Sequence, residues 1–194
     1  MDCVLKALMK KLFVSFLIVL MGVACDSPVK HIFHETGDAL DSLNGVVVYY
    51  NGLDYTQSYG SHYSDDGFYY GKKWQCVEFV KRYYHDYLHH TFPDGYGHAI
   101  SFFDKKIKHG KLNSKRNLIQ FENGNTEKPQ VNDLVVFDGK YGHVAIVSKA
   151  GEDEFEIVQQ NIGTTTRDKL QLKFKNGIYT AGKKGHLLGW LRKK

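Results

Sequence analysis

The sequence of 194 residues contains little cysteine, little proline and only a small excess of positive charge. Because proline is scarce and aromatic residues make up 14%, the composition does not suggest a disordered chain. The formal net charge is +5, and the only basic run, LRKK at residues 191–194, is short. Nucleic-acid-binding proteins usually carry a stronger cluster of Lys and Arg, so we expect no nucleic-acid partner. The length and the 42% of hydrophobic residues fit one globular domain with a leader.

A long hydrophobic run is also absent, since the longest one covers only residues 12–24. A helix that spans a membrane needs about 20 apolar residues. Lys10 and Lys11 precede the run, and small residues followed by Cys25 end it, as in a secretory signal. The segment resembles a bacterial lipoprotein signal, although Gly22 stands where leucine is usual.

This resemblance implies that Cys25 carries lipid and anchors an exported protein in the cell envelope. In a Gram-negative cell, Asp26 after the lipidated cysteine favours retention at the periplasmic face of the inner membrane. An uncleaved anchor is the alternative. We therefore expect a signal peptide at residues 1–24, a tether at residues 25–44 and the domain at residues 45–194.

The few cysteines exclude a disulfide framework. Of the three in the chain, Cys3 is removed with the signal peptide and Cys25 carries the lipid, which leaves Cys76 without a partner. A lone cysteine is either a small buried hydrophobe or a reactive thiol, and its position has to decide between the two.

Cys76 lies near the start of the strongest helical pattern, at residues 74–90. One apolar stripe recurs at spacings of three and four, at Cys76, Phe79, Val80, Tyr83, Tyr87 and Leu88. The opposite stripe is predicted to face solvent and consists of Glu78, Lys81, Arg82, His85 and His89. Glu78 and Arg82 are expected to form a surface pair worth a few tenths of a kcal/mol.

The remaining pattern predicts an α+β fold. A first strand is expected at residues 45–50, followed by a long loop rich in Tyr, Gly, Asp and Ser. Residues 95–130 are ambiguous, with a second helix possible at residues 99–107. From Val131 onward short strands alternate with turn residues, which indicates an antiparallel sheet after the helix.

A thiol in the first turn of a helix is exposed to unpaired backbone N–H groups, which favour the thiolate. A nucleophilic cysteine also needs an imidazole. A hairpin with its turn at Gly151 places His143 opposite Gln159. The two side chains then lie on the same face of the sheet. The amide oxygen of Gln159 then accepts the Nδ1 proton of His143 and leaves Nε2 toward the thiol.

Five segments now carry a resemblance: KWQCVEFVKR, DLVVF, GHVAIV, VQQN and NGIYT…LLGWL, in this order. They resemble the CHAP family of cysteine- and histidine-dependent amidohydrolases and peptidases, and within it the amidase domains of glutathionylspermidine synthetase/amidases. The similarity runs from about residue 45 to residue 191. It implies a papain-like α+β fold, with the cysteine at a helix N-terminus packed on an antiparallel sheet that bears the histidine.

The resemblance also implies site residues. Cys76 is the nucleophile and His143 the base and later the acid, and the backbone N–H of Cys76, with Gln75, faces the oxyanion. The orienting position falls on Gln159, where the family usually has glutamate, and Asn161 two residues on is retained. The loss of the carboxylate weakens the support for an imidazolium.

Two aromatic residues before the helix, Trp74 and Tyr70, are candidates for substrate binding, although side chains in such a place also serve as core. The sequence thus predicts a thiol amidase or peptidase that needs no cofactor and no metal. Its substrate is a peptide of peptidoglycan or an amide of the glutathionylspermidine type. The alternative is a weakened scaffold that binds cell-wall peptide or a protein partner.

Overall fold

The computed structural model describes residues 33–182 and 186–194. The predicted signal peptide, residues 1–24, and the predicted lipidation site Cys25 lie outside these residues. Residues 34–194 form one compact unit, separate from residues 1–33. Within the described parts of the chain, no helix combines the length and the apolar character needed to cross a bilayer.

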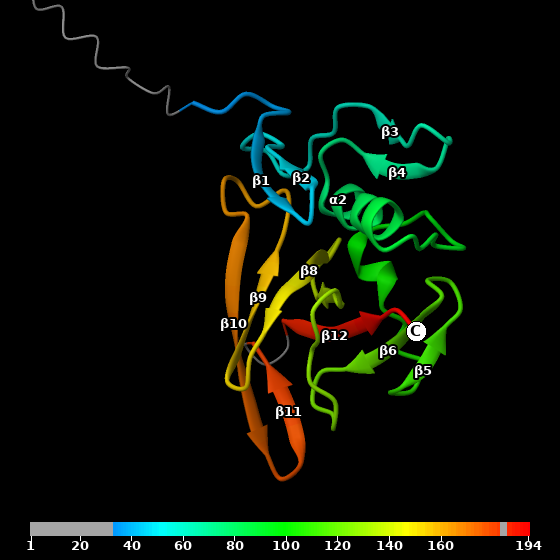
Figure 1. Ribbon diagram of the computed structural model, residues 1–194, viewed down its shortest axis with the longest axis vertical. Helices are drawn as coiled ribbons and strands as arrows, with labels where there is room; N and C mark the ends of the chain where they lie inside the picture. The colour runs from blue at the N-terminus through cyan, green and yellow to red at the C-terminus, as the bar shows by residue number, and fades with distance from the viewer. Residues whose placement is uncertain (1–32, 183–185) are drawn as a thin grey trace, which may run out of the picture. The chain divides into compact units, whose positions relative to one another are not determined.

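An antiparallel sheet of eight strands runs through this unit (Figure 1). The strands lie in the order β11-β10-β9-β8-β7-β12-β6-β5. Their bounds are β5 (Lys111–Asn113), β6 (Leu118–Glu122), β7 (Leu134–Phe137), β8 (His143–Ala150), β9 (Glu154–Val158), β10 (Arg167–Lys175), β11 (Ile178–Ala181) and β12 (Leu187–Arg192). Every neighbouring pair is antiparallel, and most neighbours are consecutive in the chain. Residues 159–166, which include Gln159 and Asn161, connect β9 to β10.

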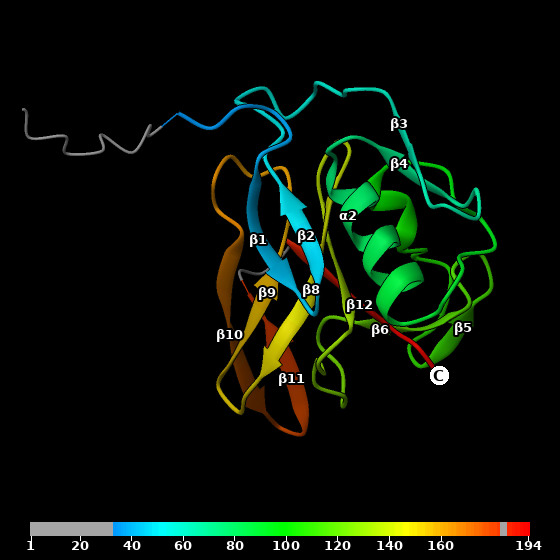
Figure 2. The ribbon, with the colours of Figure 1, turned by 45° about the horizontal axis from the view of Figure 1, so that its top comes forward.

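One helix and two hairpins lie beside the sheet. The hairpins are β1 (Ala39–Leu43) with β2 (Val46–Tyr49), and β3 (Ser61–Tyr63) with β4 (Tyr69–Lys72). Helix α2 (Cys76–Arg82) continues into the π-helical turn η1 (Tyr83–Tyr87), and η2 (Ala99–Phe102) is a 3-10 turn. Figure 2 shows α2 close to both hairpins. The predicted α+β class agrees with this largely β structure and its short helix.

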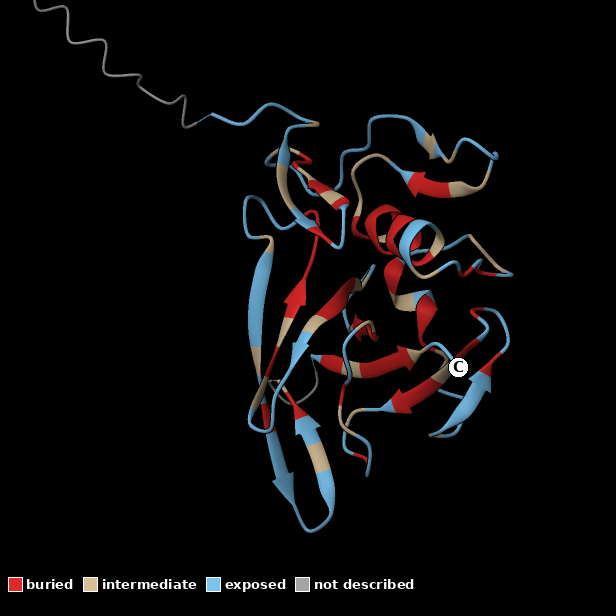
Figure 3. Ribbon diagram, viewed as in Figure 1, coloured by how far each residue is buried: buried red, intermediate tan, exposed pale blue. Residues whose placement is uncertain are grey.

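The middle strands of the sheet, such as β7 and β12, are largely buried, whereas β10, β11 and β5 are mostly exposed (Figure 3). One core cluster joins α2 and the β1–β2 hairpin to the sheet and contains Val144 and Ile146. The other cluster packs on the opposite face and contains Ala145, Val147 and Trp190. Successive residues of β8 therefore serve the two clusters in turn, as the alternation of a strand requires.

Three residues of the polar stripe are buried, contrary to the sequence prediction, whereas His89 is exposed as predicted and His85 is partly exposed. Glu78 and Lys81 are fully buried and Arg82 is nearly so, at 6% exposure. The two hairpins cover this side of α2, since Arg82 donates to the carbonyl of Val47 and Lys81 donates to the carbonyl of Tyr69. The predicted exposure of these three residues was wrong because residues 61–72, expected to belong to a loop, form the β3–β4 hairpin that covers the helix.

Several short elements lie outside the predicted ones. Strand β1 falls in the segment assigned to the tether, and β5 and β6 fall in the ambiguous segment of residues 95–130. The possible helix at residues 99–107 is only the turn η2. By contrast, the strands expected after Val131 are present.

Candidate functional site

Cys76 is a free cysteine and the first residue of α2. Gln75 precedes it with extended backbone angles, φ −77° and ψ 157°, so the chain turns sharply into the helix at this point. The side chain lies on the face of α2 that packs on the sheet and is 8% exposed. The backbone N–H groups of Val144, Val77 and Cys76 itself favour its thiolate form. The thiol therefore lies against the second residue of β8.

Burial raises the pKa of the Cys76 thiol to about 11, and the three N–H groups offset this only in part. The sequence analysis expected a lowered value from the helix start. The difference arises because the free energy needed to remove a thiolate from water is larger than the stabilisation that these backbone N–H groups provide.

His143 is the first residue of β8 and is held by Gln159. Its Nε2 lies 3.0 Å from Oε1 of Gln159, and the amide nitrogen of Gln159 donates to the carbonyl of Thr165 at 3.4 Å. The amide oxygen thus faces the ring, so Nε2 carries the proton and Nδ1 is the basic nitrogen. The expected contact between His143 and Gln159 is present, but through the other ring nitrogen than predicted.

The register of the hairpin also differs from the predicted one. Ile146 pairs with Val158 and Val147 with Ile157, a shift of two residues from the predicted pairing, and a bulge follows Val147. Because the shift is even, His143 and Gln159 stay on one face. That face carries the second core cluster, whereas Cys76 belongs to the first.

Cys76 thus packs in the first cluster with Val144, whereas the preceding residue, His143, lies on the other face of β8. Within residues 33–182 and 186–194, the Cys76 sulfur makes no hydrogen bond to the imidazole of His143. Burial lowers the pKa of His143 to about 4, and the hydrogen bond that His143 donates to Gln159 opposes this shift. The resting site therefore combines a neutral thiol with a neutral imidazole.

Gln75 has its hydrogen-bond donors occupied. Its backbone N–H donates to the carbonyl of Lys72 at 2.9 Å, and its side-chain amide donates to the carbonyls of Tyr55 and Gln57. In this arrangement Gln75 has no donor left for an oxyanion, and the backbone N–H of Cys76 is the remaining candidate.

Asn161 contacts Gln75 rather than His143. Its amide donates to Oε1 of Gln75 and to the carbonyl of Tyr55, each at 2.9 Å, and its oxygen accepts from Asn51 at 2.8 Å. Asn51 also accepts the backbone N–H of Trp74 at 2.9 Å. Sequence reasoning missed Asn51, since an asparagine after a strand is an ordinary turn residue. These amides fix the segment that leads into Cys76.

The two aromatic candidates lie differently. Trp74 is partly exposed, and its ring lies 4.0 Å from that of Tyr49. Tyr70 is buried at 5% exposure and donates its hydroxyl to Asp86 at 2.5 Å. Tyr70 borders a groove of about 730 Å³, and neither Cys76 nor His143 lines that groove. Trp74 thus packs on Tyr49, two residues before Cys76 in the chain, and Tyr70 borders a groove that does not include the thiol.

Comparison with known proteins shows the family of this chain. The family model for the CHAP domain matches residues 65–161, which is half of the chain and runs from the β3–β4 hairpin to Asn161. The chain belongs to the CHAP domain family. The matched segment contains Cys76, His143, Gln159 and Asn161.

Two kinds of curated protein are similar to this CHAP chain. Bifunctional glutathionylspermidine synthetase/amidase of Escherichia coli (strain K12) is 29% identical over 157 residues, which covers 70% of this chain and 25% of that protein. The protein of the same name from Shigella flexneri gives the same values. Trypanothione synthetase of Crithidia fasciculata is 28% identical over 144 residues, covering 70% of this chain and 22% of that protein. The chain spans about a quarter of the length of these relatives.

Proposed function

We propose that this CHAP chain is a cysteine-dependent amide hydrolase with Cys76 as nucleophile and His143 as base. The observation that carries the proposal is the position of the thiol. Cys76 begins a helix and packs in one core cluster with Val144, the residue after His143, and Nε2 of His143 donates to Gln159. Membership of the CHAP family and the amidase in the names of two relatives support it.

In the proposed reaction the Cys76 sulfur attacks an amide carbonyl while Nδ1 of His143 takes the thiol proton. The backbone N–H of Cys76 faces the oxygen that becomes negative. His143 then protonates the leaving amine as the C–N bond breaks, which leaves a thioester on Cys76. Water, activated by His143, attacks the thioester and releases a carboxylic acid and the free thiol.

Two substrate classes fit this reaction. An amide of the glutathionylspermidine type follows from the names of the relatives. A peptide amide of peptidoglycan follows from the export and lipid anchoring at Cys25 that we propose from the sequence. We favour the cell-wall peptide, because an envelope location brings the protein to that substrate.

The test is mass spectrometry of the products after incubation of the purified protein with peptidoglycan fragments and, separately, with glutathionylspermidine. Cys76→Ala and His143→Ala are each expected to lower hydrolysis by at least about 10²-fold while circular dichroism stays unchanged. His109→Ala is the matched control, because His109 packs on Phe121, in a different strand from the site. Near-normal turnover in Cys76→Ala or His143→Ala would remove that residue from the mechanism.

A second candidate function is a CHAP scaffold that binds cell-wall peptide without turnover. The neutral amide of Gln159 beside His143 favours it, because a neutral partner does not stabilise an imidazolium. Binding of peptidoglycan fragments without any product, in a protein whose fold is intact, would select this candidate.

A further inference from the structure

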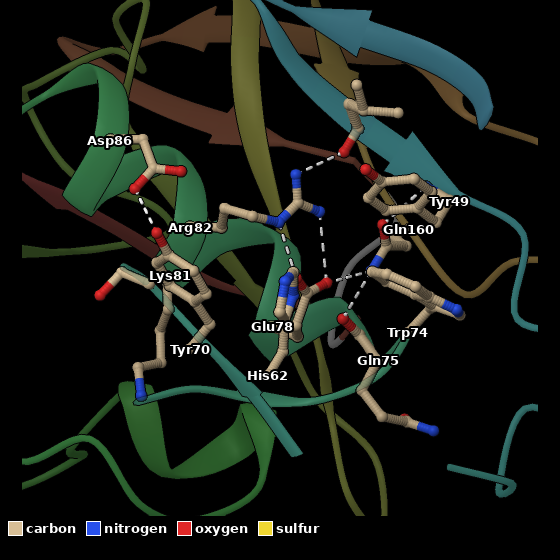
Figure 4. A network of polar contacts seen from close by, with 12 residues as sticks. Tyr49, His62, Tyr70, Trp74, Gln75, Glu78, Lys81, Arg82, Asp86 and Gln160 are labelled. Atoms are coloured by element: carbon tan, nitrogen blue, oxygen red, sulfur yellow. Dashed lines mark hydrogen bonds and ion pairs between the residues drawn. The ribbon is translucent and has the colours of Figure 1, made fainter. Parts of the chain in front are cut away.

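A buried carboxylate lies two residues after the proposed nucleophile. Glu78 is fully buried, and Figure 4 shows four hydrogen bonds that converge on its carboxylate. Their donors are His62 Nδ1 at 2.7 Å, Arg82 Nε at 2.6 Å, Arg82 Nη2 at 3.3 Å and Gln160 Nε2 at 2.7 Å. The positive charge of Arg82 already balances the negative charge of Glu78. Charge compensation therefore does not explain why Gln160 also donates to this carboxylate.

Gln160 connects this carboxylate to the beginning of the helix. It is 1% exposed, and its amide nitrogen also donates to the backbone carbonyl of Gln75 at 3.0 Å. Its amide oxygen accepts the backbone N–H of Tyr49 at 2.8 Å. The side chain of Gln160 therefore fixes the peptide unit that joins Gln75 to Cys76.

The neighbour of Gln160 in the chain is the residue that holds the histidine. Gln159 accepts a hydrogen bond from His143, while Gln160 reaches Gln75 and Glu78. The two residues follow the end of β9 at Val158, and their side chains reach different groups. Two consecutive residues thus hold the two halves of the proposed pair. Gln160 holds the peptide unit before Cys76, and Gln159 holds the imidazole of His143.

We propose that Gln160 is a positioning residue, which together with Glu78 sets the place of Cys76 relative to His143. The inference rests on the proposed function, because it assigns Gln160 a role in the alignment of the Cys76–His143 pair. A displacement of about 1 Å in such a pair can cost about 10²-fold in rate.

Alkylation of Cys76 by iodoacetamide tests the proposal without any substrate. The full chain is used, and mass spectrometry follows the peptide that contains Cys76, so the other thiols do not interfere. The quantity is the factor by which His143→Ala slows alkylation, measured in three backgrounds: wild type, Gln160→Met and Gln120→Met. Gln120 is the matched control, because it is also fully buried and its side chain is also hydrogen-bonded to backbone groups. Those groups belong to Asp104, and Gln120 lies in β6, another part of the sheet.

We expect His143→Ala to slow alkylation by about tenfold or more in the wild type and in Gln120→Met, but to have little effect in Gln160→Met. Gln160→Asn provides a milder variant if Gln160→Met does not fold, because its shorter side chain cannot bridge Glu78 and Gln75. An undiminished His143→Ala factor in a folded Gln160 variant would overturn the inference. If His143→Ala has no effect even in the wild type, the Cys76–His143 pair of the proposed function fails, and the inference fails with it.

Discussion

The protonation state of the proposed pair follows from what surrounds each group. Burial holds the pKa of Cys76 at about 11 and that of His143 at about 4, so both groups are neutral between these values. Among the described residues, no charged side chain hydrogen-bonds either group, since the partner of His143 is the amide of Gln159. Catalysis at neutral pH then requires proton transfer during the attack rather than a preformed thiolate.

A carboxylate at residue 159 is expected to change this state. Gln159→Glu places a negative charge at Nε2 of His143, which raises the pKa of His143. The imidazolium that then forms favours the thiolate of Cys76. We expect alkylation of Cys76 to begin at lower pH, and hydrolysis to stay unchanged or to rise. The test is to measure the rate of Cys76 alkylation and the rate of hydrolysis as functions of pH.

Gln159→Ala is the control for this prediction, because it removes the hydrogen bond without adding charge. A large fall of hydrolysis in Gln159→Glu would mean that the amide itself is required.

At the scale of the residue, sequence reasoning found the contact between His143 and Gln159 but not its details. The face of the strand follows from alternation, which survives a register shift of two residues. The choice of ring nitrogen depends on the contact between Gln159 and Thr165, which no spacing in the sequence reveals.

At the scale of the element, helix α2 depends on a charge pair that the sequence placed on the surface. Glu78→Leu leaves the buried guanidinium of Arg82 without its carboxylate, and we expect a loss of about 3–5 kcal/mol in the free energy of unfolding. Urea denaturation measures this. The control is Lys169→Ala, which breaks the exposed pair with Glu154 and should cause no measurable loss. Equal losses in both variants would contradict the role given to burial.

The same pair predicts a dependence of stability on pH. Burial alone raises the pKa of Glu78, but His62, Arg82 and Gln160 together bring it below 4.5. A carboxyl with a lowered pKa in the folded state stabilises the fold above its ordinary pKa. This contribution is lost as the pH falls through the folded value.

The strands that the sequence predicted are those with clear alternation and many β-branched residues, such as β7 and β8. The missed strands are short or polar, such as SHY in β3 and KLN in β5. Tertiary contacts hold them in place, as when Lys81 binds the carbonyl of Tyr69 in β4. A local pattern cannot contain such information.

At the scale of the whole molecule, both core clusters lie between Leu43 and Leu191. We therefore expect a fragment of residues 34–194 to fold by itself. Its melting temperature should lie within about 2–4 °C of that of the full chain in detergent, the shift that 1 kcal/mol produces in a domain of this size. Thermal melts followed by circular dichroism test this, and a fragment without a cooperative transition would contradict it.

The position of β12 has a consequence for how the protein is made. This strand lies between β7 and β6, although its residues, 187–192, are the last strand of the described chain to be synthesised. The middle of the sheet, and with it the burial of Trp190, cannot be completed while these residues are still on the ribosome. A nascent chain would stay open until then, and an open chain is the form that an export channel can accept.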